Sequence, residues 1–481
     1  GLGDVYKRQA MQLLDLITIF IFALGIVIMG LSFSGKGRNM KSFFAAGGAV
    51  PWLMSGLSLF MGFFSAGTFV VWGSIAYSLG WIAISIQWTM AIAGFVVGFF
   101  IAPRWHKTSA LTVAEYITRR LGVNTQKTYT YLFLFISLFT TGSFLYPVAK
   151  IVEVFTGMPL DLCILLLGGF CIVYVAAGGL WAVVSTDVLQ FIILTAAVLI
   201  VVPLSFGRVG GVVNFIESIP ATYFNLVNGE YTIGFIVAFG VYNTIFLGGN
   251  WAYVQRYASV NSQSSARKVG FLFGGLYVVS AVLWMLPPMI YRIVNPSLST
   301  IDAEGAYLMM CKEVLPAGLL GLMLSGMVFA TASSLNATLN ISSGVVTNDI
   351  FKRLFPQSSD KTLMRVARIS TIIFGLLAII VALLIPLMGG IVNVVISVAA
   401  LTGVPLYLPI IWTLFSKRQT EYSVITTTLV SLGANAFFKF ITPLWGFGFN
   451  RAEEMIVGVA FPVLCLIAFE LYYKLNHKIS H

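Results

Sequence analysis

Charged residues are scarce in this sequence: Asp, Glu, Lys and Arg make up 9% of its 481 residues, against about 25% in a typical soluble domain. Apolar residues make up 58%, and the mean hydropathy is +0.94. A chain of this length could not cover a water-facing surface with so few charges, which excludes a water-soluble enzyme and a secreted domain. The hydrophobicity also excludes a disordered chain. The composition therefore predicts an integral membrane protein.

Cysteine and histidine are equally rare, and neither predicts a metal centre. The four cysteines match no metal-site spacing and lie mostly in apolar runs, so we interpret them as packing residues. There are only three histidines. The net charge of +11 is accounted for by Lys and Arg in cytoplasmic loops. We therefore expect no organic cofactor and no nucleic-acid partner.

Apolar stretches of about 20 residues, the length that crosses a bilayer as a helix, recur along the chain. We predict thirteen spans: 11–34, 50–77, 79–102, 128–156, 159–177, 182–206, 233–255, 268–291, 315–341, 367–386, 389–415, 421–442 and 455–473. No segment shows the short-period alternation of an outer-membrane barrel. The sequence thus predicts an all-α integral membrane protein with about thirteen transmembrane helices.

The ends of the chain are predicted to lie on opposite sides of the membrane, because the number of spans is odd. With the N-terminus outside, most Lys and Arg residues, Arg256 among them, fall in cytoplasmic loops, as the positive-inside rule requires. We expect a bacterial inner-membrane protein with a cytoplasmic tail at 474–481. Residues 1–10 are polar and precede Met11, and we interpret them as a non-native leader.

Two predicted spans are interrupted by glycine. The second contains Gly62 and the segment 65–67 near its middle, and the seventh contains 248–249 before Asn250. Backbone groups released inside a bilayer must be buried or line a cavity. Broken spans five apart are typical of a transporter built from inverted repeats, with its site at the breaks. Glycine that only permits close helix packing is the alternative.

Asp187 is the clearest charge inside a predicted span. A charge in the membrane costs roughly 2.5–3.5 kcal/mol on insertion scales, and this one lies in the cytoplasmic half of the sixth span, beside Thr186. We interpret Asp187 as a relay for a cation; the alternative is a carboxylate favoured by the helix dipole at a helix start. Three other acidic residues lie closer to span ends and are interpreted as interfacial: Asp15, Glu153 and Glu470.

The ninth span carries an unusual number of hydroxyl and amide groups, in the segment ATASSLNATLN at 330–340. Ser333 and Ser334 are adjacent there, and Ala330 lies one turn earlier. Na⁺ is a hard cation that binds oxygen, and two hydroxyls together with carbonyls released at the break in the second span would supply its ligands. A small-residue packing face with hydrogen bonds across helices is an equally good explanation.

The chain resembles the sodium/solute symporter family, which includes the sodium/galactose, sodium/proline and sodium/sialate transporters. The matching segments are SFFAAGG (42–48), SAGTF (65–69), LTVAEYITRRLG (111–122), GGLWAVVSTDVLQ (178–190), NWAYVQRY (250–257), ATASSLN (330–336) and TNDIFKRLF (347–355). The resemblance implies a five-plus-five inverted repeat of the leucine-transporter type. The repeats would span 50–206 and 233–415, with a leading helix at 11–34 and trailing helices at 421–473.

The resemblance also implies a site for one co-transported Na⁺. Its ligands would be three backbone carbonyls and two hydroxyls, those of Met61, Phe64, Ala330, Ser333 and Ser334. Asp187 matches the family's acidic residue on the inward path of the ion. A second ion is not expected, because Asn336 and Ala337 stand where members with two ions have further ligands.

The positions that match the family's substrate pocket carry no charge; they are Thr68, Gln87, Asn243, Phe246 and Tyr277. Galactose transporters have Glu at the position of Gln87, Lys at Tyr277 and Gln at Ile396, so we expect galactose to be a poor substrate. No arginine lies in the centre of the fourth span to bind a carboxylate. We predict sodium-coupled uptake of a small neutral polar solute by alternating access. A sodium-coupled organic-anion or amino-acid symporter is the alternative.

Other classes of membrane protein fit less well. A membrane-embedded transferase should carry clusters of ionisable catalytic residues at an interface, and a channel should carry filter segments or charged rings. The sequence has neither. We therefore expect a transporter and not an enzyme, with the solute, Na⁺ and the lipid bilayer as its partners. The sequence predicts no oligomeric state.

Overall fold

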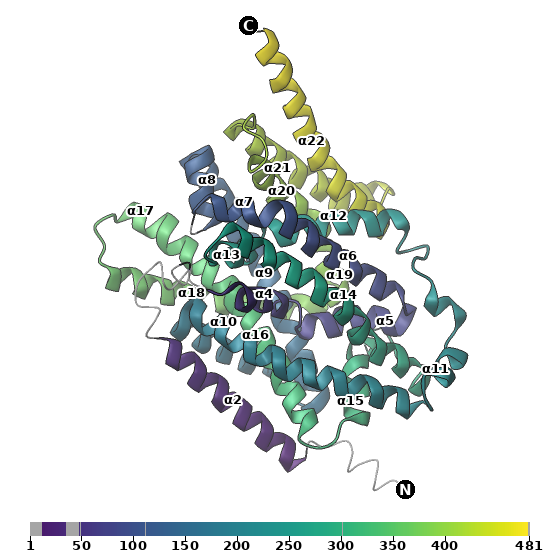
Figure 1. The fold of residues 1–481 in the computed structure, drawn as a ribbon. Helices are drawn as coiled ribbons and strands as arrows, with labels where there is room; N and C mark the ends of the chain where they lie inside the picture. Colours follow the sequence, from purple (N-terminus) through teal and green to yellow (C-terminus); the bar gives the residue numbers. More distant parts are fainter. Residues whose placement is uncertain (1–11, 35–47, 49, 111, 301, 480–481) are drawn as a thin grey trace.

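The computed structural model describes residues 12–34, 48, 50–110, 112–300 and 302–479. Within its helices, some side chains lie outside the description: those of residues 30, 33–34, 177–183, 185, 332–333, 336–337 and 477–479. The described chain is a bundle of helices and contains no strand in these ranges (Figure 1). The predicted all-α class is confirmed.

The bundle consists of α-helices and short 3₁₀ or π-helical segments, which are labelled η. In the first half these are α2 (Leu13–Ser34), α4 (Trp52–Met61), η3 (Thr68–Trp72), α5 (Gly73–Leu79), α6 (Ile82–Val96), η4 (Val97–Ile101), α7 (Ala102–Lys107), α8 (Val113–Leu121), α9 (Val123–Thr156), α10 (Leu160–Arg208), α11 (Val212–Ser218) and η5 (Ala221–Phe224). The second half contains α12 (Ile233–Gly249), α13 (Trp251–Ala258), α14 (Gln263–Val294), η6 (Asp302–Gly305), α15 (Ala306–Val314), α16 (Leu319–Val345), η7 (Val346–Phe351), α17 (Lys352–Leu354), α18 (Asp360–Leu384), η8 (Ile385–Met388), α19 (Ile391–Val398), η9 (Ala399–Gly403), α20 (Val404–Thr413), α21 (Glu421–Ala436), η10 (Phe437–Ile441), η11 (Thr442–Trp445) and α22 (Arg451–Ile479).

Eight of the described helices are long and apolar enough to cross a membrane, and the bent pair α12–α13 makes a ninth. Five shorter apolar helices fall on the remaining predicted spans: Leu13–Met29, Trp52–Met61, Thr68–Leu79, Leu160–Ala176 and Leu319–Thr331. Each predicted span therefore coincides with apolar helix. The number of thirteen crossings and the inverted repeat stay predictions.

Both predicted breaks are present. In the second predicted span, α4 ends at Met61, and regular helix resumes only at Ala66, before the π-helical η3. At the second break, α12 and α13 are bent by 57° around Asn250, whose side chain accepts a hydrogen bond from the Ala252 N–H at 3.0 Å. A Cβ on Gly249 would lie 2.8 Å from the side chains of α20. At this position the glycine therefore allows close packing beside the break.

The secondary structure of α10 runs through both the fifth and the sixth predicted span, over 49 residues. The Tyr174 hydroxyl nevertheless donates to Thr186 Oγ1 at 2.9 Å, whereas twelve residues of straight helix rise about 18 Å. Phe170 and Leu194 also both contact the same part of α16, through Phe329 and Gly326 respectively. The helix α10 is therefore not straight between Tyr174 and Thr186, and both of its halves contact α16.

Asp15, which is predicted to lie near a membrane interface, caps a neighbouring helix. The residue is 2% exposed, and its Oδ1 accepts the backbone N–H groups of Gly318 and Gly321 at 2.7 and 2.9 Å. These amides lie at the start of α16, where the first turn of a helix has no internal acceptors and a carboxylate is favoured. The leading helix α2 thus caps the helix that carries Ser334.

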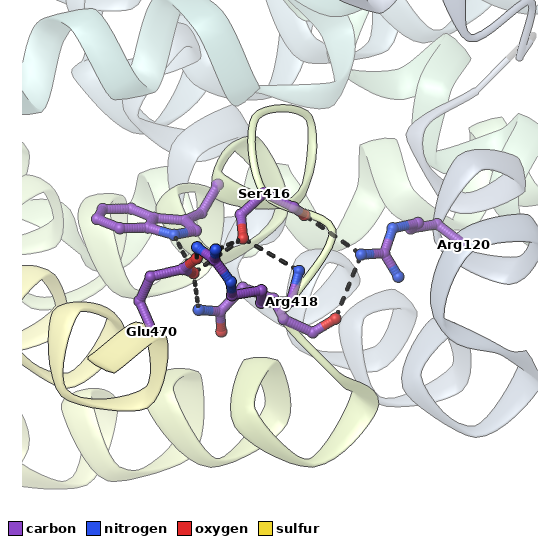
Figure 2. A network of polar contacts seen from close by, with 6 residues as sticks. Arg120, Ser416, Arg418 and Glu470 are labelled. Carbon is purple, nitrogen blue, oxygen red and sulfur yellow. Dashed lines mark hydrogen bonds and ion pairs between the residues drawn. The ribbon is translucent and has the colours of Figure 1, made fainter. Parts of the chain in front are cut away.

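Glu470, another predicted interfacial residue, belongs to a network of polar contacts that joins three parts of the chain (Figure 2). Its carboxylate on α22 accepts hydrogen bonds from Ser416 at 2.8 and 2.9 Å and from Arg418 at 3.0 Å. Arg120 of α8 donates to the backbone carbonyls of Ser416 and Gln419, both at 3.3 Å. The link between α20 and α21 is therefore held to α8 on one side and to α22 on the other.

Candidate functional site

A cavity lies where the two broken spans meet, and we call it the central cavity. It is enclosed by residues of the first break, η3, α6, α9, α12, α14 and the segment α19–η9. All five residues predicted to bind the substrate line it: Thr68, Gln87, Asn243, Phe246 and Tyr277. The helices thus bring together positions that are up to about two hundred residues apart in the sequence.

The polar groups of the central cavity are oriented by one another. The Tyr277 hydroxyl of α14 donates to Gln87 Oε1 of α6 at 2.9 Å. Asn243 Nδ2 of α12 donates to Thr89 Oγ1 at 2.8 Å, and Thr68 Oγ1 donates to the Phe63 carbonyl in the first break. All four of these predicted residues are at least nine-tenths buried. Buried polar groups held in this way present a fixed pattern to a ligand.

None of the described residues that line the central cavity is Asp, Glu, Lys, Arg or His. Its walls are instead strongly aromatic: Phe63, Trp72, Phe144, Phe239, Tyr242, Phe246, Tyr253, Tyr277 and Tyr407. Phe246 stands among three of these rings, with Tyr242, Tyr253 and Tyr407 at 5.5, 5.4 and 6.0 Å between ring centroids. The cavity suits a ligand with hydroxyl or amide groups and an apolar face.

Ser334 connects α16 with the first break. Its Oγ lies 3.2 Å from the carbonyl oxygen of Gly62 and 3.4 Å from that of Ala330, one turn earlier on α16. Gly62 lies between the two predicted carbonyl ligands, Met61 and Phe64. The side chain of Ser333 lies outside the described residues. Oxygen atoms of α16 and of the break therefore meet at one point, as a cation site requires.

Asp187 faces the same region through a second, much smaller cavity, which we call the ion-side cavity. Asp187 is 1% exposed, and its Oδ2 accepts a hydrogen bond from Ser58 Oγ at 2.6 Å. Ser58 Oγ in turn accepts from Arg256 Nε at 3.2 Å. Gly62 and Ser334 line this cavity with them. A carboxylate, a guanidinium and the oxygen atoms around Ser334 thus share one enclosed space.

The sequence profile described as "Sodium:solute symporter family" matches residues 43–430. This chain belongs to the sodium:solute symporter family. The sodium/glucose cotransporter of Vibrio parahaemolyticus is 29% identical to it, with 98% of this chain and 92% of the relative covered. The sodium/sialic acid symporter NanT of Aliivibrio fischeri is 23% identical, with 94% and 93% covered.

Solved structures agree with the fold of the symporter. A substrate-bound, outward-open Na⁺-coupled sialic acid symporter matches with a TM-score of 0.80 at 21% identity, over 96% of this chain and 98% of the other. The nucleobase-cation-symport transporter Mhp1, in a closed conformation, matches with a TM-score of 0.58 at 14% identity, over 89% and 93%. The symporter is a membrane transporter that uses Na⁺ as its co-transported ion, and it is not an enzyme.

Arg256 of the symporter is not the loop residue that the sequence predicts. It is 3% exposed in α13, and it interacts electrostatically with Asp187. The reason is the second break: a new helix starts after Asn250 and carries Arg256 back into the bundle. A buried guanidinium needs a partner, so Arg256 belongs to the ion-side cavity.

The sequence alone does not single out several residues that line the central cavity. Thr140 and Ser143 of α9 line it, as do Trp72, Tyr407 and Thr402. On α9 the lining positions follow the helical spacing of three and four residues, which marks one face. Hydroxyl residues at this spacing on an apolar helix indicate either a polar cavity or a polar contact between helices.

Proposed function

We propose that the symporter takes up one small neutral polar solute with one Na⁺ by alternating access. The observation that carries this proposal is the central cavity, whose described lining has aromatic rings and neutral polar groups but no acid or base. A carboxylate buried there would lack a cationic partner, and an unpaired buried charge is strongly unfavourable. A sugar-like or polyol solute would find donors and acceptors in Gln87, Asn243 and Thr68 and an apolar wall in Phe246.

The proposed ion ligands are the carbonyls of Met61, Phe64 and Ala330 and the hydroxyls of Ser333 and Ser334. The contact between Ser334 and the Gly62 carbonyl supports this set, because it brings α16 against the break. An ion held there would tie α16 to the segment that also carries Thr68. Sodium and solute would then stabilise the same arrangement of the break, which is how binding at two sites becomes coupled.

The proposed path of the ion to the cytoplasm passes Asp187. Its support is the ion-side cavity, which Asp187 shares with Ser334. Entry of one charge down the membrane potential releases about 2.3 kcal/mol per 100 mV, which is available to accumulate the solute. The inverted repeats, the inner-membrane location and the orientation with the N-terminus outside belong to the same proposal.

Uptake by purified protein in proteoliposomes tests the proposal. With an inward Na⁺ gradient, we expect accumulation of labelled D-glucose or myo-inositol, with galactose a poor substrate and N-acetylneuraminate not transported. A choline gradient of the same size is the control. Uptake of N-acetylneuraminate in preference to the neutral solutes would favour the organic-anion alternative. Tight, Na⁺-dependent galactose binding would contradict the assignment of the pocket.

A further inference from the structure

One hydroxyl group joins Asp187 to Arg256 in the ion-side cavity. Ser58 Oγ donates to Asp187 Oδ2 at 2.6 Å and accepts from Arg256 Nε at 3.2 Å. The three side chains belong to α10, α4 and α13, and none of them is more than 3% exposed. A carboxylate buried in this way needs a partner of opposite charge. The guanidinium of Arg256 supplies that charge, and Ser58 connects the two groups.

The guanidinium has two further partners that do not depend on Asp187. Arg256 Nη1 donates to the Ala252 carbonyl at 3.4 Å and to Gln255 Oε1 at 3.3 Å. Both acceptors lie on α13, the helix that carries Arg256. A guanidinium has several N–H donors in a fixed geometry, so these two oxygen atoms remain bonded to it when Nε is released. Arg256 can therefore give up Ser58 and Asp187 without leaving its charge bare.

A cation on the proposed path meets the same carboxylate. Ser334 and Thr338 of α16 line the ion-side cavity together with Asp187 and Arg256. An ion that leaves Ser334 thus enters a space that already contains one positive charge. Two cations beside a single carboxylate repel each other, and the repulsion is strong where water is excluded. Na⁺ and the guanidinium therefore weaken each other's hold on Asp187.

A carboxylate without this competitor would be a poor step on an ion path. An ion is conducted only if each site binds it well enough for entry and weakly enough for exit. A buried carboxylate with no other partner would retain Na⁺, because its release would leave an uncompensated charge. Arg256 removes this obstacle, since a tethered positive charge stands ready to replace the departing ion.

We propose that Arg256 is a positioning residue that competes with Na⁺ for Asp187 and thereby promotes release of the ion. Ser58 aligns the carboxylate and the guanidinium with each other. Na⁺ and the guanidinium alternate as the partner of Asp187, and only hydrogen bonds and ion contacts change. The inference rests on the proposed ion path past Asp187, and it adds a competitor for the ion that belongs to the protein itself.

Thermal unfolding of the purified full chain tests the inference without any solute. Arg256→Gln leaves Asp187 without its counter-ion, and Na⁺ can then take that place. We expect the melting temperature of this variant to fall by several degrees in choline chloride and to recover most of the loss in NaCl of equal ionic strength, since a bound ion stabilises the folded state. Arg256→Lys keeps the positive charge and should gain no more from Na⁺ than the wild type does.

The matched control is Asp187→Asn combined with Arg256→Gln, which has no carboxylate for the ion to neutralise. Its melting temperature should gain no more from Na⁺ than that of the wild type. An extra gain in this double variant would overturn the inference, because the ion would then act elsewhere. A loss in Arg256→Gln that is equal in NaCl and choline chloride would also overturn it, because Arg256 would then be purely structural.

Ser58→Ala keeps both charges but removes the hydroxyl that joins them, so it gives the same decision if Arg256→Gln does not fold. We expect a smaller extra gain from Na⁺ in this variant, and no extra gain would contradict the inference. Uptake provides a second readout: Na⁺ inside proteoliposomes should inhibit Arg256→Gln at a concentration at least about tenfold lower than it inhibits the wild type. Failure of neutral solutes to accumulate would refute the proposed function and leave the melting curves unchanged.

Discussion

The central cavity and the ion-side cavity are neighbours with opposite chemistry. The described lining of the central cavity has no acid or base and is rich in aromatic rings, whereas the ion-side cavity contains Asp187 and Arg256. Gly62 and Tyr253 line both. Charge is thus confined to one side of the first break, and under the proposed function the solute would bind on the other side.

The largest effect is expected from removing the hydroxyls of α16. Ser333→Ala with Ser334→Ala deletes two proposed ion ligands, so Na⁺-stimulated uptake should fall to the level seen in choline. Ser325→Ala is the matched control, because Ser325 is buried on the same helix but bonds the Gly321 carbonyl, away from the break. Initial uptake rates against Na⁺ concentration measure the effect. Full Na⁺ stimulation in the double variant would refute the proposed site.

A charge placed in the central cavity should remove the chemical difference between the two cavities. Ser143→Arg adds a guanidinium to the lining of α9, where a carboxylate could pair with it. We expect uptake of neutral solutes to fall at least about tenfold, since desolvating an unpaired charge exceeds 1.4 kcal/mol. Binding of N-acetylneuraminate, measured by calorimetry, should appear or strengthen. Ser143→Ala is the control and should keep neutral uptake within a few-fold.

Asp187→Asn removes the negative charge from the ion-side cavity while keeping the side-chain volume. The Asn can still accept a hydrogen bond from Ser58, but Arg256 loses the charge of its partner. Removing one partner of a buried ion pair destabilises a protein by about 3–5 kcal/mol. We expect slower turnover and a weaker dependence on Na⁺, with solute binding retained. If Asp187 is only a structural residue, uptake per folded molecule will be normal and the melting temperature alone will fall.

The charge of Arg256 provides a further check on the same variant. Asp187→Asn combined with Arg256→Gln removes both charges and should recover part of the melting temperature. It should not recover the Na⁺ dependence, because the proposed role of Asp187 is to attract the cation. A double variant with restored Na⁺ dependence would show that the pair acts only on stability.

Local pattern predicted much of this structure, and distant contacts account for the rest. The breaks at Gly62 and Asn250 follow from glycine in apolar helices, and the cavity position of Gln87 follows from the family resemblance. The cap that Asp15 provides to Gly318 joins residues about three hundred positions apart, which no local pattern contains. The sequence predicts Arg256 in a loop because a basic residue directly after a span looks the same whether the next helix leaves the bundle or returns into it.

Gln87→Leu should affect the solute more than the ion. The variant loses the hydrogen bond from Tyr277 and leaves that hydroxyl buried without its partner, which costs about 1–3 kcal/mol. We expect the KM for the solute to rise about tenfold or more, while the Na⁺ dependence at saturating solute is nearly unchanged. Solute-dependent uptake at several fixed Na⁺ concentrations separates the two. A parallel loss of Na⁺ stimulation would mean that the cavities are not chemically separate.

The smallest effect concerns Glu304 of η6, an ionisable carboxyl at the edge of this neutral region. It is 6% exposed near Gly390, at the start of the segment that lines the central cavity. Burial raises the pKa of its carboxyl from 4.5 to about 7, while Lys150 and the Ile391 backbone N–H act in the opposite direction. The folded protein therefore holds a proton that the unfolded chain releases. The stability from this group is present below about pH 4.5 and is lost as the pH rises to about 7.

Glu304→Gln should remove this contribution to the pH dependence. We expect the melting temperature of the wild type to fall by a few degrees more than that of the variant between pH 5 and pH 8. Asp302→Asn, an exposed position in the same turn, is the control and should follow the wild type. Transport at pH 5 should be nearly equal in wild type and variant, because both then carry a neutral side chain. An identical pH dependence of melting in wild type and Glu304→Gln would mean that the carboxyl titrates at its ordinary pKa, and that the edge of the cavity is charged at neutral pH.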